Sequence, residues 1–302
     1  MKVVVLGATG MLGSMVLSWL SKDSQLNLVA TGRDRSLFPD MQRLAPGCRT
    51  EILDAETATS SDLSTLIDGA DWVVNCIGVI KPYIKDDNPT QTVRALRVNA
   101  LFPHHLAAAA ERTGARVLQI ATDCVYSGQK GGYCEQDPHD ALDVYGKSKS
   151  LGEVHSGQVH HLRCSIIGPE PKCHVSLLDW FLGQAKGAGV KGFTNHDWNG
   201  VTTLHYAKVC HGVIRSNLTL PRLLHVVPSG TITKANLLKA FAASYNRQDI
   251  TIDPVAAPTV VDRTLGTAQA ELNATLWQAA GYAQPPTVET MVQGMAAYGS
   301  LS

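Results

Sequence analysis

Residues 3–20 read VVVLGATGMLGSMVLSWL, and this stretch decides the predicted fold. Four branched apolar residues precede a glycine cluster, a pattern typical of a β-strand buried on both faces. With the spacing G-x-x-G-x-x-G, Gly7 permits a tight turn, Gly10 admits a pyrophosphate, and Gly13 allows close helix packing. The free N–H groups that open the helix would face the phosphates. We predict dinucleotide contacts from Gly7, Thr9, Gly10, Met11, Leu12 and Gly13; the alternative is a glycine-rich turn without a ligand.

Composition argues against several classes of partner. The 302 residues are 44% hydrophobic, and 26 basic residues balance 26 acidic ones. A net charge of zero provides no general attraction to nucleic acid or to an anionic membrane, so we expect neither as a partner. No apolar run approaches the roughly 18 residues that span a bilayer, and we see no secretory signal. Any affinity for an anion must therefore come from a local site.

The cysteines point to a reducing compartment. There are seven, they are scattered along the chain, and none forms a C-x-x-C pair. This pattern favours neither a metal cluster nor a disulfide framework, so we expect no metal and a cytoplasmic protein. The adjacent pair His160-His161 has no acid or cysteine at ligand spacing, and we expect both histidines at an edge or in solvent.

Strands and helices alternate after the first helix. We expect strands at 26–30, 51–54, 71–78 and 115–121 and a long alanine-rich helix at 90–112. Such alternation predicts an α/β fold with a doubly wound parallel sheet and right-handed crossovers. Because ligands in these sheets bind beyond the carboxyl ends of the strands, the glycine turn, Asp54, Ile77 and Thr122 should share one edge.

The cofactor preference depends on the end of the second strand. Arg33 lies 20 residues after Gly13, where proteins that bind NAD usually place an acid on the ribose. An arginine there can instead pair with a 2′-phosphate, which favours NADPH, with NADH as the alternative because Asp34 is adjacent. An exposed loop arginine without a ligand is the other interpretation. Asp54 is placed to accept from the adenine amino group.

Three side chains suggest carbonyl chemistry. Tyr145 and Lys149 are four residues apart, so on a helix they share one face. A nearby ammonium favours the phenolate and would bring the phenol into a useful range for acid–base work. Thr122, directly after the strand at 115–121, can donate to a carbonyl oxygen. A Tyr and Lys at this spacing also occur by chance, but their agreement with the glycine turn strengthens the catalytic interpretation.

The whole pattern resembles the extended short-chain dehydrogenases/reductases. Within that superfamily, residues 121–128 (ATDCVYSG), 133–138 (YCEQDP) and 144–153 (VYGKSKSLGE) are similar to the dTDP-4-dehydrorhamnose reductase branch. The resemblance implies a Rossmann domain formed by 1–168 and 201–229, and a small substrate lobe formed by 169–200 and 230–302. It also implies reduction, with NADPH, of the 4-keto group of a nucleotide-linked 4-keto-6-deoxy sugar. A homodimer is compatible with it.

The resemblance also implies residue roles. Tyr145 would donate a proton to the keto oxygen, Thr122 would orient the carbonyl, and Lys149 would hold the nicotinamide ribose and lower the pKa of Tyr145. The expected cofactor contacts beyond the glycine turn are Arg33, Asp54, Cys76, Ile77, Gly78, Asn99, Tyr145, Lys149 and Ile167. The expected substrate contacts are Asp123, Cys124, Trp198, Asn199 and Arg263. Arg163 is expected to be structural.

The chain departs from this branch at several positions, which leaves the exact sugar open. Cys124 replaces a tyrosine, Ser127 replaces an acid, and the loop at 81–88 is unusual. An epimerase or dehydratase of the same superfamily is one alternative, although Cys124 is not the glutamate that a dehydratase places beside its threonine. A non-catalytic NADP-binding regulatory subunit is the other, although it would not need Thr122, Tyr145 and Lys149 together.

Overall fold

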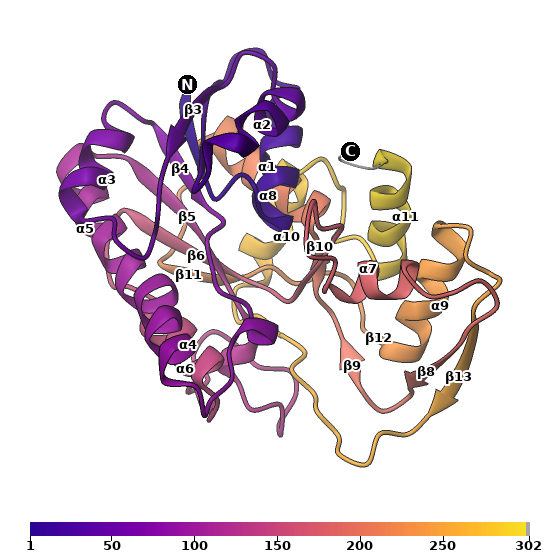
Figure 1. Ribbon diagram of the computed structural model, residues 1–302. Coiled ribbons are helices and arrows are strands. Elements are labelled where there is room, and N and C mark those ends of the chain that lie inside the picture. Colours follow the sequence, from indigo (N-terminus) through magenta and orange to yellow (C-terminus); the bar gives the residue numbers. More distant parts are fainter. Residues whose placement is uncertain (300–302) are drawn as a thin grey trace.

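The computed structural model describes residues 1–299 and contains a central seven-stranded sheet (Figure 1). The strand order is β11-β6-β5-β4-β1-β2-β3, and every neighbouring pair is parallel. The strands are β1 (Lys2–Leu6), β2 (Asn27–Gly32), β3 (Arg49–Ile52), β4 (Trp72–Asn75), β5 (Arg116–Ala121), β6 (Val159–Arg163) and β11 (Leu223–His225). This order confirms the predicted doubly wound Rossmann sheet, with its chain reversal between β1 and β4.

Helices cover both faces of the sheet because β1 presents apolar side chains alternately to each. Val3 and Val5 join a core cluster with α1 (Met11–Leu20) and α8 (Thr203–Ser216), whereas Val4 and Leu6 join one with α3 (Ser60–Ile67) and α5 (Phe102–Thr113). Both layers are visible in Figure 1. The shorter elements are α2 (Phe38–Leu44) and the 3-10 turns η1 (Arg35–Leu37), η2 (Lys81–Tyr83) and η4 (Asp123–Val125).

The helix predicted over 90–112 is interrupted in its middle. It consists of α4 (Pro89–Ala95), a π-helical turn η3 (Leu96–Leu101) and α5. Pro103 has no N–H to donate to the carbonyl of Asn99 one turn earlier, so the regular ladder cannot continue there. Gly152 lies against that same carbonyl, since a Cβ on Gly152 would come within 1.9 Å of the Asn99 oxygen. The interruption therefore brings the helix close to the segment that follows α6 (Val144–Leu151).

The C-terminal part forms a smaller lobe beside the sheet (Figure 1). It contains α7 (Leu177–Leu182), α9 (Lys234–Ser244) and α11 (Val288–Tyr298). Its two-stranded ribbons pair β7 (Ile166–Ile167) with β10 (Val201–Thr202), β9 (Asp197–Trp198) with β12 (Ile232–Thr233), and β8 (Gly189–Phe193) with β13 (Thr251–Val255). A further helix, α10 (Ala270–Ala279), packs on α8 of the sheet domain. One apolar cluster runs through both parts, and the division into domains stays a prediction.

The position of His160 and His161 was predicted wrongly. Both side chains are buried, and they hydrogen-bond the carbonyl oxygens of Pro221 and Val154 at 3.1 Å each. The reason is that β11 pairs with β6 and takes the edge position, so β6 lies inside the sheet. In the part of the chain that the structure describes, no helix is long and apolar enough to cross a membrane. All seven cysteines are free thiols.

Candidate active site

The glycine turn has the geometry that its spacing predicts. Gly7 adopts a φ of +76°, a conformation that favours glycine, and a Cβ on Gly13 would come within 2.1 Å of the Gly7 oxygen. Gly10 precedes α1 without a capping side chain, which leaves the first N–H groups of the helix available to an anion. Thr31, which the sequence analysis missed, holds the turn: its hydroxyl accepts from the Gly7 N–H at 3.0 Å, and its carbonyl from the Ala8 N–H at 2.9 Å.

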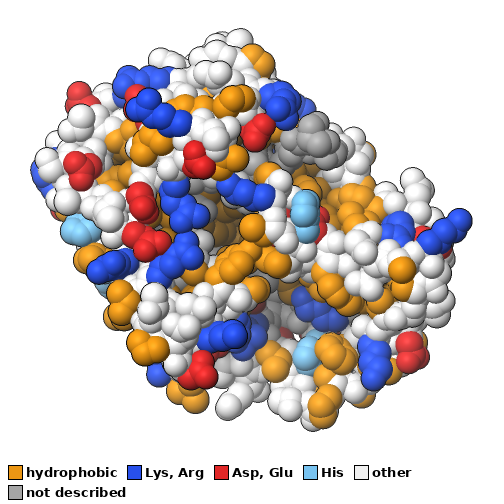
Figure 2. All heavy atoms as spheres, viewed as in Figure 1, with side chains coloured by type: hydrophobic (Ala, Val, Ile, Leu, Met, Phe, Trp, Pro, Cys, Tyr) orange, Lys and Arg blue, Asp and Glu red, His pale blue; other side chains and the backbone are white. Residues whose placement is uncertain are grey.

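This turn fits a dinucleotide. A Cβ on Gly10 would have nothing closer than the Gly7 oxygen at 3.6 Å, so the backbone is open on the side where phosphates would lie. Arg33 is exposed just beyond the end of β2. The adjacent Asp34 is occupied as a helix cap, because its carboxylate accepts from the Ser36 N–H at 2.8 Å. Asp54 is exposed two residues after β3. Figure 2 shows lysine and arginine side chains around a hollow in the middle of this face.

The exit of β4 lies against the glycine turn. A Cβ on Gly7 would meet the Ile77 side chain at 2.7 Å, so Ile77 covers the turn directly. The Cys76 N–H donates to the backbone oxygen of Leu6 in β1 at 3.1 Å, which extends the pairing of β4 with β1. Gly78 faces the side chains of Asn99 and Lys149. Burial raises the pKa of the Cys76 thiol, which is therefore a neutral packing group.

Asn99 is held by neighbouring chain groups. Its side-chain oxygen accepts from the Val79 N–H at 2.8 Å, and its amide nitrogen donates to the Val79 oxygen at 3.0 Å and to the Ser148 hydroxyl at 3.1 Å. The residue thus ties the loop after β4 to α6, which carries Tyr145 and Lys149. Its predicted role as a cofactor contact stays a prediction.

Thr122, Tyr145 and Lys149 meet at the carboxyl end of β5. Thr122 begins the turn η4, and its hydroxyl lies near enough to the Tyr145 phenol to lower the pKa of that phenol slightly. The larger effect is burial, which raises the pKa of Tyr145 well above its usual value of about 10. In this structure burial therefore outweighs any lowering of the Tyr145 pKa by Lys149. The phenol keeps its proton at neutral pH.

Lys149 is a buried ammonium. It is 8% exposed, and its Nζ donates to the Ile120 oxygen at 3.4 Å. Burial lowers the pKa of Lys149 to about 8, an effect that the negative charge of Glu153 opposes. An ammonium with one weak partner has further donors available to a ligand in the cleft.

A pocket of about 300 Å³ lies beside this group, between the sheet and the small lobe. Of the predicted substrate contacts, Asp123, Cys124, Trp198, Asn199 and Arg263 all line it. Its other walls come from Ser165, His196, Asp197, Lys234 and Val261. The structure therefore brings together residues separated by up to 140 positions, while Arg33, Asp54 and Ile167 do not line this pocket.

Two of the lining residues, Trp198 and Asn199, are held in place by hydrogen bonds within the protein. The Trp198 indole donates to the Ser165 hydroxyl at 2.8 Å and packs against Gly200, where a Cβ would lie 2.3 Å from the ring. The Asn199 side chain pairs with both backbone groups of Leu265, at 2.7 and 2.9 Å. Asn199 thus uses its polar atoms on the chain itself, and its predicted contact with a substrate stays a prediction.

Asp123 and Cys124 line the pocket at the turn that follows Thr122. Burial raises the pKa of the Asp123 carboxyl, an effect that Arg263, the Thr122 hydroxyl and Lys234 oppose. Burial and the charge of Asp123 together raise the pKa of the Cys124 thiol to about 12, so this thiol is neutral. The position thus contributes a small uncharged wall.

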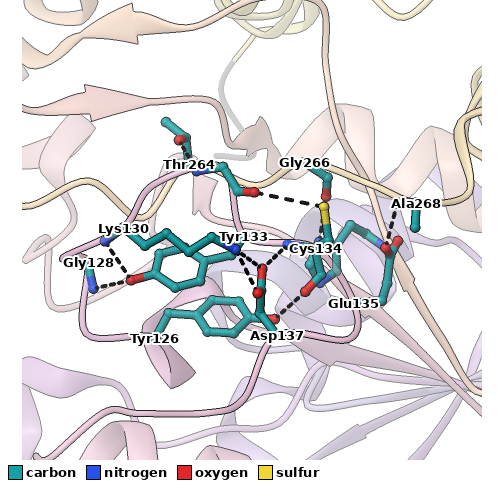
Figure 3. Close-up of polar contacts among 12 residues, drawn as sticks. Tyr126, Gly128, Lys130, Tyr133, Cys134, Glu135, Asp137, Thr264, Gly266 and Ala268 are labelled. Carbon is teal, nitrogen blue, oxygen red and sulfur yellow. Dashed lines mark hydrogen bonds and ion pairs between the residues drawn. The ribbon is translucent and has the colours of Figure 1, made fainter.

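The motif at 133–137 fixes the chain segment that carries Arg263 (Figure 3). The rings of Tyr126 and Tyr133 stack with centroids 4.2 Å apart, and the Tyr133 backbone pairs with that of Thr264 and Gly266. Glu135 accepts from the Thr267 hydroxyl at 2.6 Å and from the Ala268 N–H at 3.0 Å. Arg263 donates hydrogen bonds to the backbone carbonyl oxygens of Tyr126 and Ser127, which hold its guanidinium at the pocket.

A buried ion pair lies just after the C-terminal end of α6, between Arg163 and Glu153. Arg163 is fully buried, and one of its nitrogens donates to both carboxylate oxygens of Glu153 at 2.6 Å. The same guanidinium contacts Tyr126, His139 and His225. Burial alone would raise the pKa of Glu153, but Arg163 holds it below its usual value. Arg163 is therefore structural, as predicted.

Lys234 is a charged pocket residue that was not predicted from the sequence. It is the first residue of α9, and its Nζ lies 5.4 Å from the centroid of the Trp198 ring. A lone lysine after a threonine carries no sequence signal, because only the pairing of β12 with β9 brings it over the indole.

Comparisons with known proteins agree with this description. A dTDP-4-dehydrorhamnose reductase of Mycobacterium tuberculosis is 30% identical over 158 residues, which cover 50% of this chain and 44% of that protein. The chain thus spans less than half the length of these curated relatives. Methionine adenosyltransferase 2 subunit beta of Rattus norvegicus is 27% identical over 154 residues, covering 50% and 41%.

Solved structures extend the likeness of the fold to nearly the whole chain. A dTDP-4-dehydrorhamnose reductase of Yersinia enterocolitica matches with a TM-score of 0.75 and 21% identity, covering 98% of both chains. One of Bacillus anthracis str. Ames, solved in complex with NADP, matches with a TM-score of 0.74 and 18% identity, covering 99% of both.

The sheet order, the glycine turn and the Thr–Tyr–Lys group together define an extended short-chain dehydrogenase/reductase fold. Within that class, the family model described as RmlD substrate binding domain matches residues 1–167, more than half of the 302 residues. The chain therefore belongs to this family.

Proposed function

We propose that this protein reduces the 4-keto group of a nucleotide-linked 4-keto-6-deoxy sugar, with NADPH as cofactor. One observation carries the proposal: Thr122 and Tyr145 meet at the carboxyl end of β5, between the glycine turn and the pocket lined by Asp123 and Arg263. The names of the relatives from Mycobacterium tuberculosis and Yersinia enterocolitica support the choice of sugar.

Separate residues would bind separate parts of the cofactor. When bound, the cofactor supplies the hydride. The first turn of α1 would hold its phosphates, and Arg33 would pair with a 2′-phosphate, since Asp34 is occupied by the Ser36 N–H. Lys149 would donate to the ribose. NADPH is thus favoured over NADH.

Proton transfer would come from Tyr145. The Thr122 hydroxyl would donate to the ketone oxygen and hold it beside the phenol. The Tyr145 phenol carries its proton at neutral pH, as a phenol with a pKa near or above 10 does, so Tyr145 can supply the proton that the new hydroxyl requires. We place this reaction in the cytoplasm, which the seven free thiols support.

The test is NADPH oxidation with a panel of freshly generated 4-keto nucleotide sugars. We expect Tyr145→Phe to keep NADPH binding and to lower turnover at least about a hundredfold, the scale of a lost proton donor. The matched control is Tyr298→Phe, because Tyr298 lies on α11 and contacts Ser18. A wild-type protein that binds NADPH but reduces no member of the panel would instead support a regulatory subunit.

A further inference from the structure

The small lobe holds one cation at a fixed place in the pocket. Thr233 and Ile232 of β12 pair with Asp197 and Trp198 of β9, and the Lys234 N–H donates to the His196 oxygen at 2.9 Å. This ribbon sets the first turn of α9 directly over the Trp198 ring, with the ammonium 5.4 Å from its centroid. The position of Lys234 is therefore a property of the ribbon and not of a flexible loop.

Within residues 1–299 the ammonium of Lys234 forms no hydrogen bond or close ion pair, although the carboxyl of Asp123 lies near enough to affect its pKa. No carboxylate or carbonyl oxygen there lies within hydrogen-bond distance of its Nζ, and its neighbour in the pocket is an indole face. Burial lowers the pKa of Lys234, against the opposing charge of Asp123. Because Asp123 interacts with both Lys234 and Arg263, two cations face one carboxyl group here, and an anionic ligand would balance the remaining positive charge.

A second cation faces the same space from another segment. The Nε and one terminal nitrogen of Arg263 donate hydrogen bonds to the backbone carbonyl oxygens of Tyr126 and Ser127. The other terminal nitrogen is left for a ligand. Both cations lie near enough to Asp123 to lower the pKa of its carboxyl. Asp197 also lines the pocket, but it is exposed to solvent, which screens its charge.

We propose that Lys234, together with Arg263, binds the diphosphate of the nucleotide sugar. The assignment rests on the proposed function, because it takes the part of the pocket next to Thr122, at Asp123 and Cys124, for the sugar. A diphosphate carries a charge on each phosphoryl group, which matches two cations on separate segments. The N-terminus of the 11-residue helix α9 adds a favourable dipole for an anion at the same place.

Binding of a nucleoside diphosphate tests this without turnover. Calorimetry would compare dTDP and UDP, and thymidine and uridine without phosphates, on the NADP-loaded protein. We expect Lys234→Gln to weaken the better diphosphate about tenfold or more, the scale of a hydrogen bond between charged groups, and to leave the nucleosides unchanged. Lys234→Arg should restore part of the affinity. The matched control is Lys239→Gln on the same helix, which is exposed and contacts Asn236.

The outcomes separate this assignment from the proposed function. Equal diphosphate affinity in the wild type and Lys234→Gln, or an equal loss for the nucleosides, would overturn the assignment even if 4-keto sugars are reduced. A loss confined to the diphosphates supports it even if no ketone in the panel is reduced. Where reduction is measured, Lys234→Gln should raise KM much more than it lowers kcat, because the contact is made equally in ground and transition states.

Discussion

Replacing Lys149 by methionine should stabilise the protein while it removes activity. Lys149 is 8% exposed and donates only to the Ile120 oxygen, at 3.4 Å. Burial lowers its pKa from 10.5 to about 8. At about 1.4 kcal/mol per pH unit, the folded protein loses about 3 kcal/mol at pH 7 by holding this charge. Methionine has a similar length and no charge, so it should recover much of that amount.

The gain should depend on pH in a defined direction. The folded state binds the Lys149 proton less tightly than the unfolded state, so unfolding takes up a proton between about pH 8 and 10.5. The wild type therefore gains stability as the pH rises through this window, and Lys149→Met does not. The advantage of the variant should be full below pH 8, about half as large near pH 9.5, and nearly absent above 10.5.

Urea denaturation at pH 7, 8.5 and 9.5 measures the difference in the free energy of unfolding. The matched control is Lys147→Met on the same helix, which is exposed and should change stability by less than about 0.5 kcal/mol. A variant that is less stable than the wild type at pH 7 would refute the reasoning. So would an advantage that stays constant from pH 7 to 9.5.

Three further changes address separate parts of the molecule. Gly13→Ala should lower the melting temperature and NADPH affinity together, because its Cβ would come within 2.1 Å of the Gly7 oxygen; an unchanged melting curve would contradict the close packing. Glu153→Gln should cost about 3 to 5 kcal/mol in urea denaturation, since it leaves Arg163 charged and fully buried. Arg33→Ala should weaken NADPH more than NADH in a fluorescence titration, and an equal loss would mean that Arg33 does not contact the phosphate.

The sheet domain could be predicted because its signals are local. The four apolar residues before Gly7 and the glycine spacing specify a strand, a turn and a helix within 20 residues. The edge of the sheet could be predicted only in part. The sequence predicts a strand at 222–227 that returns to the sheet, but not which strand it pairs with. His160 and His161 are buried because this strand pairs with β6 and takes the edge position.

The site was predicted where the chemistry lies in one motif and missed where it depends on tertiary pairing. Thr122, Tyr145 and Lys149 follow from short motifs near one strand and one helix. Thr31 and Lys234 have no such motif. Thr31 acts through the neighbouring β1–β2 pairing, and Lys234 through the β9–β12 ribbon, which joins segments more than 30 residues apart.

The pKa of Tyr145 shows where a prediction from spacing and the folded structure differ. From the Tyr and Lys spacing alone, the nearby ammonium should favour the phenolate and lower the pKa of the phenol into a useful range for proton transfer. In the structure Lys149 is buried and Tyr145 is partly buried, so the pKa of the phenol rises while that of the ammonium falls to about 8. The proton therefore stays on Tyr145 at neutral pH. A protonated phenol beside Thr122 is the form that could give a proton to the alkoxide of a reduced ketone, which agrees with the proposed reaction.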